Sequence, residues 1–162
     1  MVFERICRFL DDNKVSYRVL AHEPAITSAA AATLRGTPLE RGAKALVMKV
    51  KGQGFSLFVV PAHCSVDSAR VRSQLKASRL RFADREELLA LTGLVPGCVP
   101  PFGQPLMPYP VYVDSSFADR RDDMVFTAGR LDRSIALAVP DYLACADARL
   151  FPFARQVPVA RT

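Results

Sequence analysis

Residues 43–62, AKALVMKVKGQGFSLFVVPA, decide the fold of this chain of 162 residues. Two runs rich in apolar and β-branched residues, 43–50 and 55–62, flank the glycine-containing turn KGQG. Apolar runs of this length joined by such a turn are typical of a β-hairpin. We therefore predict two paired strands that belong to a central sheet.

Helical and extended patterns alternate on both sides of this hairpin. Thr27 (or Ser28), Asp67 and Asp84 stand where helix N-caps are expected, and Gly36 ends one helical run. Helices are predicted at 3–13, 28–35, 68–77, 85–93 and 140–147, and further strands at 15–22, 80–83, 110–114, 124–129 and 134–139.

This order of elements predicts an α/β (α+β) fold. We expect a single domain over residues 1–162, with a mixed central β-sheet and flanking helices. The segment 151–162, FPFARQVPVART, is expected to be a loosely held tail.

Composition excludes several classes of protein. No apolar run approaches the roughly 20 residues of a membrane span, and the first residues lack a signal-peptide pattern, so a cytoplasmic protein without membrane contact is expected. The four cysteines are scattered without a CxxC pair, and the chain has only two histidines. We therefore expect no metal site and no cofactor.

Positive charge is more informative. The net charge is +6, and basic residues gather in two groups that can attract a phosphate backbone. A solvated face that keeps the protein soluble is the alternative. The basic residues selected as candidate tRNA contacts are Arg70, Arg72, Lys76, Arg79, Arg130 and Arg133.

Lys44 is the first candidate for chemistry. Alternation along the strand places Lys44 on the same face as Leu46 and opposite Ala43 and Ala45. An ammonium among apolar neighbours needs a partner. A lysine at a strand end that reaches water explains the pattern equally well.

The stretch 93–110, GLVPGCVPPFGQPLMPYP, is the second candidate. Half of the chain's prolines lie in it, and Gly97 lets the backbone approach a ligand while Pro100 holds the loop rigid. Rigid amides facing a cleft can form an oxyanion hole. The alternative is a structural crossover. Cys98 has no histidine near it in sequence, so we interpret it as a pocket-wall residue and not as a nucleophile.

Hydroxyl groups flank the turn in FTAGRLDRS. Thr127 and Ser134 are positioned to offer these groups to a cleft, with ordinary turn chemistry as the alternative. His22 precedes Glu23-Pro24 and is interpreted as a turn residue.

Five motifs in order resemble one known family. They are HEPAIT (22–27), GAKALVMK (42–49), TGLVPGCVPPFG (92–103), VYVD (111–114) and FTAGRLDRSIAL (126–137). Over about residues 3–150 the chain resembles the YbaK/EbsC family, free-standing relatives of the editing domain inserted in bacterial prolyl-tRNA synthetase.

The resemblance implies a highly twisted mixed sheet and a trans-editing deacylase. Such an enzyme hydrolyses the ester between a small mischarged amino acid (serine, threonine, alanine or 2-aminobutyrate) and tRNA, commonly tRNA(Pro). It implies aminoacylated tRNA as partner, with an aminoacyl-tRNA synthetase as a second candidate. The expected catalytic residues are Lys44, Gly97, Cys98 and Val99, and the expected substrate-binding residues are Thr27, Ala45, Pro100, Phe102, Thr127, Ala128, Gly129 and Ser134.

An aminoacyl ester is already activated, so positioned water and oxyanion stabilisation matter more than a strong base. We expect Lys44 to hold the terminal adenosine or its phosphate, and loop amides from Gly97 to Val99 to hold the ester carbonyl. Two alternatives stay open: a non-catalytic module that binds tRNA or a synthetase, and a hydrolase acting on a free small ester.

Overall fold

The predicted hairpin forms the middle of a five-stranded sheet in the computed structural model, which describes residues 1–157. β2 (Ala43–Val50) and β3 (Gly54–Pro61) pair antiparallel along their whole length. β5 (Leu80–Phe82) adds antiparallel to β2, whereas β6 (Val111–Asp114) and β9 (Arg149–Phe151) add in parallel beyond β3. The prediction of a mixed central sheet is therefore confirmed.

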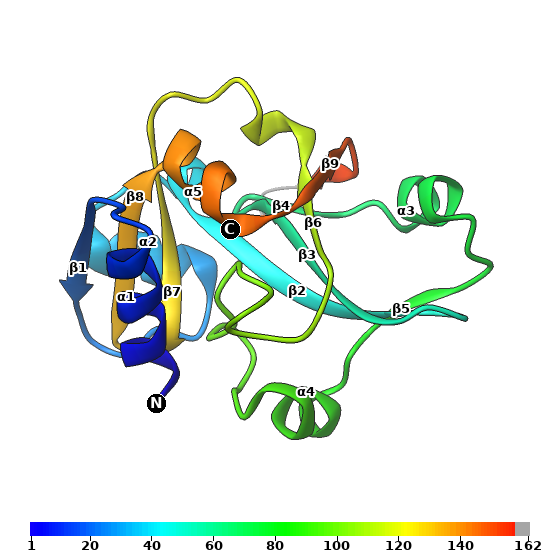
Figure 1. Ribbon diagram of the computed structural model, residues 1–162, viewed down its shortest axis with the longest axis horizontal. Coiled ribbons are helices and arrows are strands. Elements are labelled where there is room, and N and C mark those ends of the chain that lie inside the picture. The colour runs from blue at the N-terminus through cyan, green and yellow to red at the C-terminus, as the bar shows by residue number, and fades with distance from the viewer. Residues whose placement is uncertain (158–162) are drawn as a thin grey trace, which may run out of the picture.

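A second sheet stands beside the first (Figure 1). It consists of β1 (Tyr17–Ala21), β8 (Arg133–Ala138) and β7 (Asp123–Arg130), all antiparallel. α1 (Val2–Asp12) packs against β7, and a Cβ at Gly129 would lie 2.8 Å from a methyl group of Val2. The glycine in this strand thus permits close approach of the helix.

Short helices and strands complete the fold. The predicted caps are confirmed: the side chains of Thr27, Asp67 and Asp84 each accept a hydrogen bond from a backbone amide of the following helix. The remaining elements are α2 (Ser28–Arg35), η1 (Leu39–Arg41), β4 (Cys64–Val66), α3 (Ser68–Leu75), α4 (Arg85–Thr92), η2 (Ser115–Phe117), α5 (Val139–Ala146) and β10 (Ala154–Gln156).

The apolar interior forms two clusters on opposite faces of β2. Ala43 and Val47 belong to the larger cluster, and Met48 and Val50 belong to the smaller one. The alternation predicted for this strand is confirmed, and it places Lys44 on the face of the smaller cluster.

The prediction of a loose tail is wrong for residues up to 157. β9 extends the central sheet, β10 pairs antiparallel with β4, and the rings of Phe151 and Phe153 are buried. The carboxylate of Asp114 accepts hydrogen bonds from the amides of Phe153 and Ala154, both at 2.8 Å. The rest of the predicted tail, 158–162, lies outside the described residues.

Within the described part of the chain, the structure has no helix with the length and apolar character needed to cross a bilayer.

Candidate functional site

A small cavity of about 90 Å³ gathers residues from five separate parts of the chain. Its wall comes from the beginning and end of α2, the first residues of β2, the residue that follows β3, the proline-rich loop and β7. The lining residues are Ala25, Ile26, Thr27, Ser28, Arg35, Ala43, Lys44, Ala45, Leu46, Ala62, Gly97, Val99 and Thr127. The fold thus brings together Thr27, Lys44, Ala45, Gly97, Val99 and Thr127 from the set predicted from sequence.

Lys44 is the cation that β2 presents to this cavity. The side chain is half-buried, and burial lowers the pKa of its ammonium below the usual value, with an opposing effect from Cys64. No carboxylate lies within ion-pair distance of Lys44 among residues 1–157. A desolvated cation without a counter-charge favours an anionic ligand.

The proline-rich loop contributes Gly97 and Val99 to the lining of the cavity. Gly97 has φ +91°, and a Cβ there would lie 3.1 Å from the carbonyl oxygen of Ile26. The Cys98 amide donates to the carbonyl of Val95 at 3.1 Å and is therefore already used. The amides of Gly97 and Val99 have no acceptor among the described residues. These two amides remain available to a ligand.

Several predicted site residues lie elsewhere. Cys98 and Phe102 are buried in the larger core cluster, where the Phe102 ring packs edge-on against Phe9, Phe126 and Tyr142. The interpretation of Cys98 as a wall residue is wrong, because the wall is formed by its two neighbours and its thiol points into the core.

Among the predicted substrate-binding residues near the end of β7, some line the cavity and others do not. Ala128 is buried in the core, because strand alternation turns it away from Thr127. Gly129 lies against α1, and Pro100 is buried without lining the cavity. Of this group, only Thr127 offers a side chain to the cavity.

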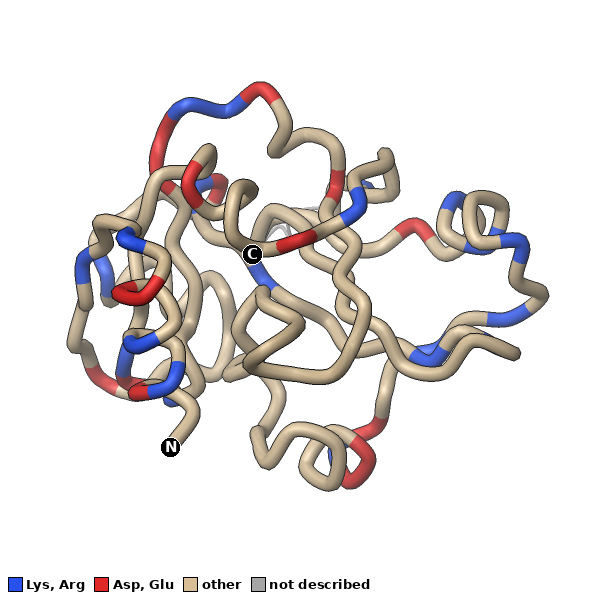
Figure 2. The backbone as a smooth tube through the Cα atoms, viewed as in Figure 1, with Lys and Arg blue, Asp and Glu red and all other residues tan. Residues whose placement is uncertain are grey.

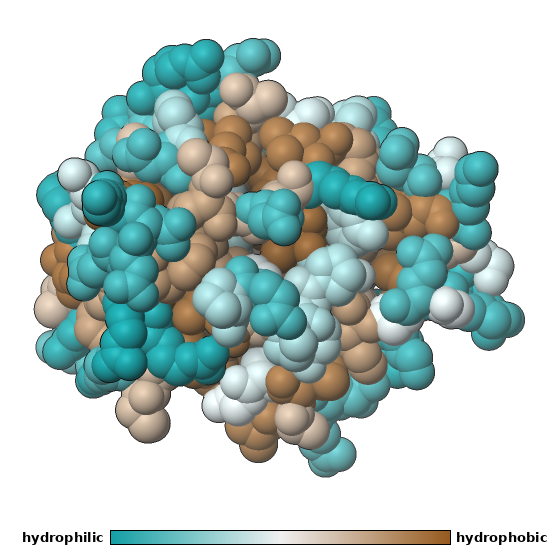
Figure 3. Space-filling model, viewed as in Figure 1, coloured by the Kyte–Doolittle hydropathy of each residue, from teal (hydrophilic) through white to brown (hydrophobic). Residues whose placement is uncertain are grey.

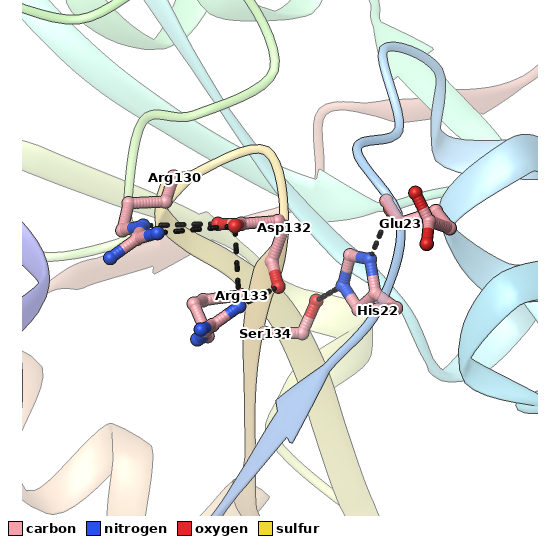
Figure 4. A network of polar contacts seen from close by, with 6 residues as sticks. All are labelled: His22, Glu23, Arg130, Asp132, Arg133 and Ser134. Atoms are coloured by element: carbon pink, nitrogen blue, oxygen red, sulfur yellow. Dashed lines mark hydrogen bonds and ion pairs between the residues drawn. The ribbon is translucent and has the colours of Figure 1, made fainter.

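Ser134 does not line the cavity, and its hydroxyl is hydrogen-bonded to His22 (Figure 4). His22 Nδ1 lies 2.8 Å from the carbonyl oxygen of Glu23, which can only accept, so Nδ1 carries the proton of the neutral ring. Nε2, 2.8 Å from Ser134 Oγ, then accepts from the hydroxyl. Ser134 is fully buried opposite Thr127 in the β7–β8 register, so its side chain does not reach a ligand directly.

The interpretation of His22 as a turn residue was incomplete. Its amide also donates to the carbonyl of Asp132 at 3.1 Å, so His22 joins the end of β1 to the β7–β8 turn. In sequence, His22 and Ser134 are more than a hundred residues apart, and no local pattern reveals the pair.

A larger, basic groove of about 550 Å³ lies at the far end of the central sheet. Figure 2 shows Lys and Arg following α3 and its connection to β5, and Figure 3 shows this end as mainly hydrophilic. Arg72 and Arg79 line the groove as candidate tRNA contacts predicted from sequence. Sequence reasoning missed Lys49 on β2 and Lys51 in the turn after it. Arg81 on β5 belongs to the same basic group in the sequence but was not selected as a contact, and the β2–β5 pairing places it opposite Lys49.

Other predicted tRNA contacts lie outside the groove. Arg70 pairs with Asp67 on another side of α3, and Lys76 is the C-cap of that helix. Arg130 and Arg133 both pair with Asp132 (Figure 4). Of the groove cations, Arg81 is bound by both carboxylate oxygens of Glu87, at 2.6 and 2.9 Å, which lowers the pKa of Glu87 to about 2.

No cluster of three or more metal-ligating side chains occurs among residues 1–157.

Comparisons with known proteins agree on one family. A family model described as "Aminoacyl-tRNA editing domain" matches residues 22–145. The multifunctional Ser/Thr-tRNA deacylase ProXp-y of Escherichia coli (strain K12) is 35% identical over 156 residues, covering 94% of this chain and 92% of that protein. The same protein from Escherichia coli O157:H7 matches equally.

Solved structures share the fold. The crystal structure of hypothetical protein APE2540 superposes with a TM-score of 0.83 at 20% identity, covering 93% of this chain and 99% of that one. A second crystal structure, of a candidate trans-editing enzyme for prolyl tRNA synthetase, gives a TM-score of 0.77 at 23% identity, covering 95% and 97%.

Proposed function

The chain belongs to the aminoacyl-tRNA editing domain family, and on this basis we propose that it is a deacylase that hydrolyses the ester between a small amino acid and tRNA. The observation that carries the proposal is that Lys44, Thr127 and two residues with unpaired amides, Gly97 and Val99, line one cavity. A cation, free amides and a hydroxyl around a small space suit an ester with a short side chain.

The mechanism follows from what these groups offer. The Gly97 and Val99 amides stabilise the oxyanion that develops when water attacks the ester carbonyl. Lys44 holds the terminal nucleotide by charge-assisted contact, which fixes the ester in the cavity. Among the described residues, no His, Asp, Glu or Cys side chain lines the cavity, and Lys44 is assigned to binding, so the activated ester is hydrolysed by a positioned water.

The cavity also sets the choice of amino acid. A cavity of about 90 Å³ is small, and this size favours a short side chain. Thr127 supplies a hydroxyl that pairs with the hydroxyl of serine or threonine, and these are the amino acids in the name of the E. coli relative. Thr127→Val is expected to reduce release of serine and threonine relative to alanine and 2-aminobutyrate.

The basic groove supplies the tRNA contact in this proposal. Arg72, Arg79 and their lysine neighbours bind the phosphate backbone while the acceptor end enters the cavity. A tRNA(Pro)-related substrate, action in the cytoplasm and cooperation with a synthetase are parts of the same proposal.

A panel of mischarged tRNAs tests the function. Serine, threonine, alanine, cysteine and 2-aminobutyrate are each esterified to tRNA(Pro), and release is followed with wild type and Lys44→Ala. Release of small amino acids by wild type and its loss in Lys44→Ala support the deacylase. Tight tRNA binding without release supports the binding module, and release from free amino-acid esters that is insensitive to salt supports the small-ester hydrolase.

A further inference from the structure

A second cation, Arg35, lines the cavity together with Lys44. Arg35 ends α2, and its Nε donates to the carbonyl of Ala31 at 3.1 Å. Its Nη1 is buried and has no hydrogen-bond partner in the part of the chain that the structure describes. The guanidinium is therefore fixed at one nitrogen and unsatisfied at another.

This arrangement is costly without a ligand. A buried N–H group without an acceptor has given up its hydrogen bond to water and forms none within the protein. Burial lowers the pKa of both Arg35 and Lys44, because each charged form loses hydration. No Asp or Glu lines the cavity among the described residues. An anionic oxygen group bound by the two cations offsets both the unsatisfied N–H group and the uncompensated charge.

We infer that Arg35 and Lys44 form one anion-binding site, and that Arg35 is the residue whose planar fork receives an anionic oxygen of the aminoacylated 3′ end of tRNA. The identity of this substrate rests on the proposed function, whereas binding of a simple anion does not. Two substrate groups have the required chemistry: the phosphate of the terminal nucleotide and the oxyanion formed at the ester carbonyl.

The variants follow from the structure. Arg35→Gln removes the charge and keeps a residue of similar helix propensity, so α2 is expected to form. Arg35→Lys keeps the charge without the fork. Arg85→Gln is the matched control, because Arg85 is an exposed arginine of α4 that lines neither the cavity nor the basic groove. Thermal unfolding of each variant verifies that it is folded.

The first measurement is a titration with inorganic phosphate, followed by the amide resonances of the loop around Gly97. We expect saturable binding to wild type and to Arg85→Gln, and at least tenfold weaker binding to Arg35→Gln, with Arg35→Lys between them. Absence of saturable binding to wild type, or equal binding to wild type and Arg35→Gln, overturns the inference.

The second measurement separates the two sources of the anion by deacylation kinetics. If Arg35 holds the terminal phosphate, Arg35→Gln raises KM about tenfold with little change in kcat; if it holds the oxyanion, kcat falls and KM is kept. Unchanged kcat and KM contradict the inference. A wild type that releases no amino acid, yet loses phosphate binding on Arg35→Gln, refutes the proposed function and leaves the anion site standing.

Discussion

Replacement of Gly97 by alanine probes the loop that forms one wall of the cavity. Gly97 has φ +91°, and its new Cβ would lie 3.1 Å from the carbonyl oxygen of Ile26, another cavity residue. Gly93 offers a matched control, because it has φ +73° and a methyl group added there would meet nothing within 4 Å. Both substitutions introduce a side chain at positive φ, but only Gly97→Ala presses on the wall.

The magnitudes follow from these two geometries. A side chain in the left-handed region costs about 1–2 kcal/mol, and for a chain of this size each kcal/mol lowers the Tm by about 2–4 °C. Gly93→Ala is therefore expected to lower the Tm by about 2–8 °C and to leave activity unchanged. Gly97→Ala carries the same cost and also displaces the wall by a few tenths of an ångström. Because small misplacements of reacting groups are expensive, we expect about a tenfold fall in kcat/KM.

The assay is release of labelled serine from Ser-tRNA, at a temperature well below the Tm of both variants. Activity lost in Gly97→Ala and kept in Gly93→Ala supports a catalytic wall at Gly97. If the Tm falls by the same amount in both variants and both keep kcat/KM within about twofold of wild type, the ester does not contact this loop.

Three further predictions follow from named contacts. Lys44→Met is expected to lower kcat/KM at least tenfold and yet to raise the Tm at pH 7 by about 2 °C. The Tm rises because burial lowers the pKa of Lys44 and disfavours its charged form in the folded state. For the wild-type protein, the free energy of unfolding should increase as the pH rises from that lowered pKa towards the ordinary pKa of lysine. Burial alone raises the pKa of Asp114, but the hydrogen bonds that its carboxylate accepts outweigh that effect, so the pKa is lowered overall. The stability that Asp114 contributes is therefore present above its ordinary pKa and is lost as the pH falls through its lowered folded-state pKa. Asp114→Asn should lower the free energy of unfolding by about 2 kcal/mol at pH 7 and make the Tm depend less on pH between pH 5 and 2. Thermal melts across this pH range measure the effect, and a pH dependence equal to that of wild type would refute this role for Asp114. Arg72→Gln with Arg79→Gln should weaken tRNA binding and reduce the slope of log K against log salt by about 2, and an unchanged slope would place the tRNA elsewhere.

The fold was predictable where the signal is local. The hairpin turn, the three capping side chains and the alternation along β2 each depend on neighbouring residues, and each is confirmed. β9 and β10 were not predicted because they are short and form only by pairing with strands distant in sequence. The carboxylate of Asp114 also holds the segment between them by accepting two backbone hydrogen bonds.

Only those candidate site residues that stand out from their local sequence could be predicted. Lys44 stood out because it interrupts an apolar strand, and Gly97 because only a flexible residue fits such a loop. Arg35 was not selected from the sequence, because nothing in its neighbourhood sets it apart and its unsatisfied Nη1 exists only in the folded chain. Cys98 and Phe102 were misplaced because a proline-rich loop has no periodicity that says which side chains face the core.

The central claim is that this cavity hydrolyses the ester of a small amino acid on tRNA. The most direct measurement is single-turnover release of serine from Ser-tRNA by wild type and by Lys44→Ala, with both proteins shown to be folded. We expect rapid release by wild type and release near the uncatalysed rate by Lys44→Ala. Equal release by the two proteins, or no release by wild type, would contradict it.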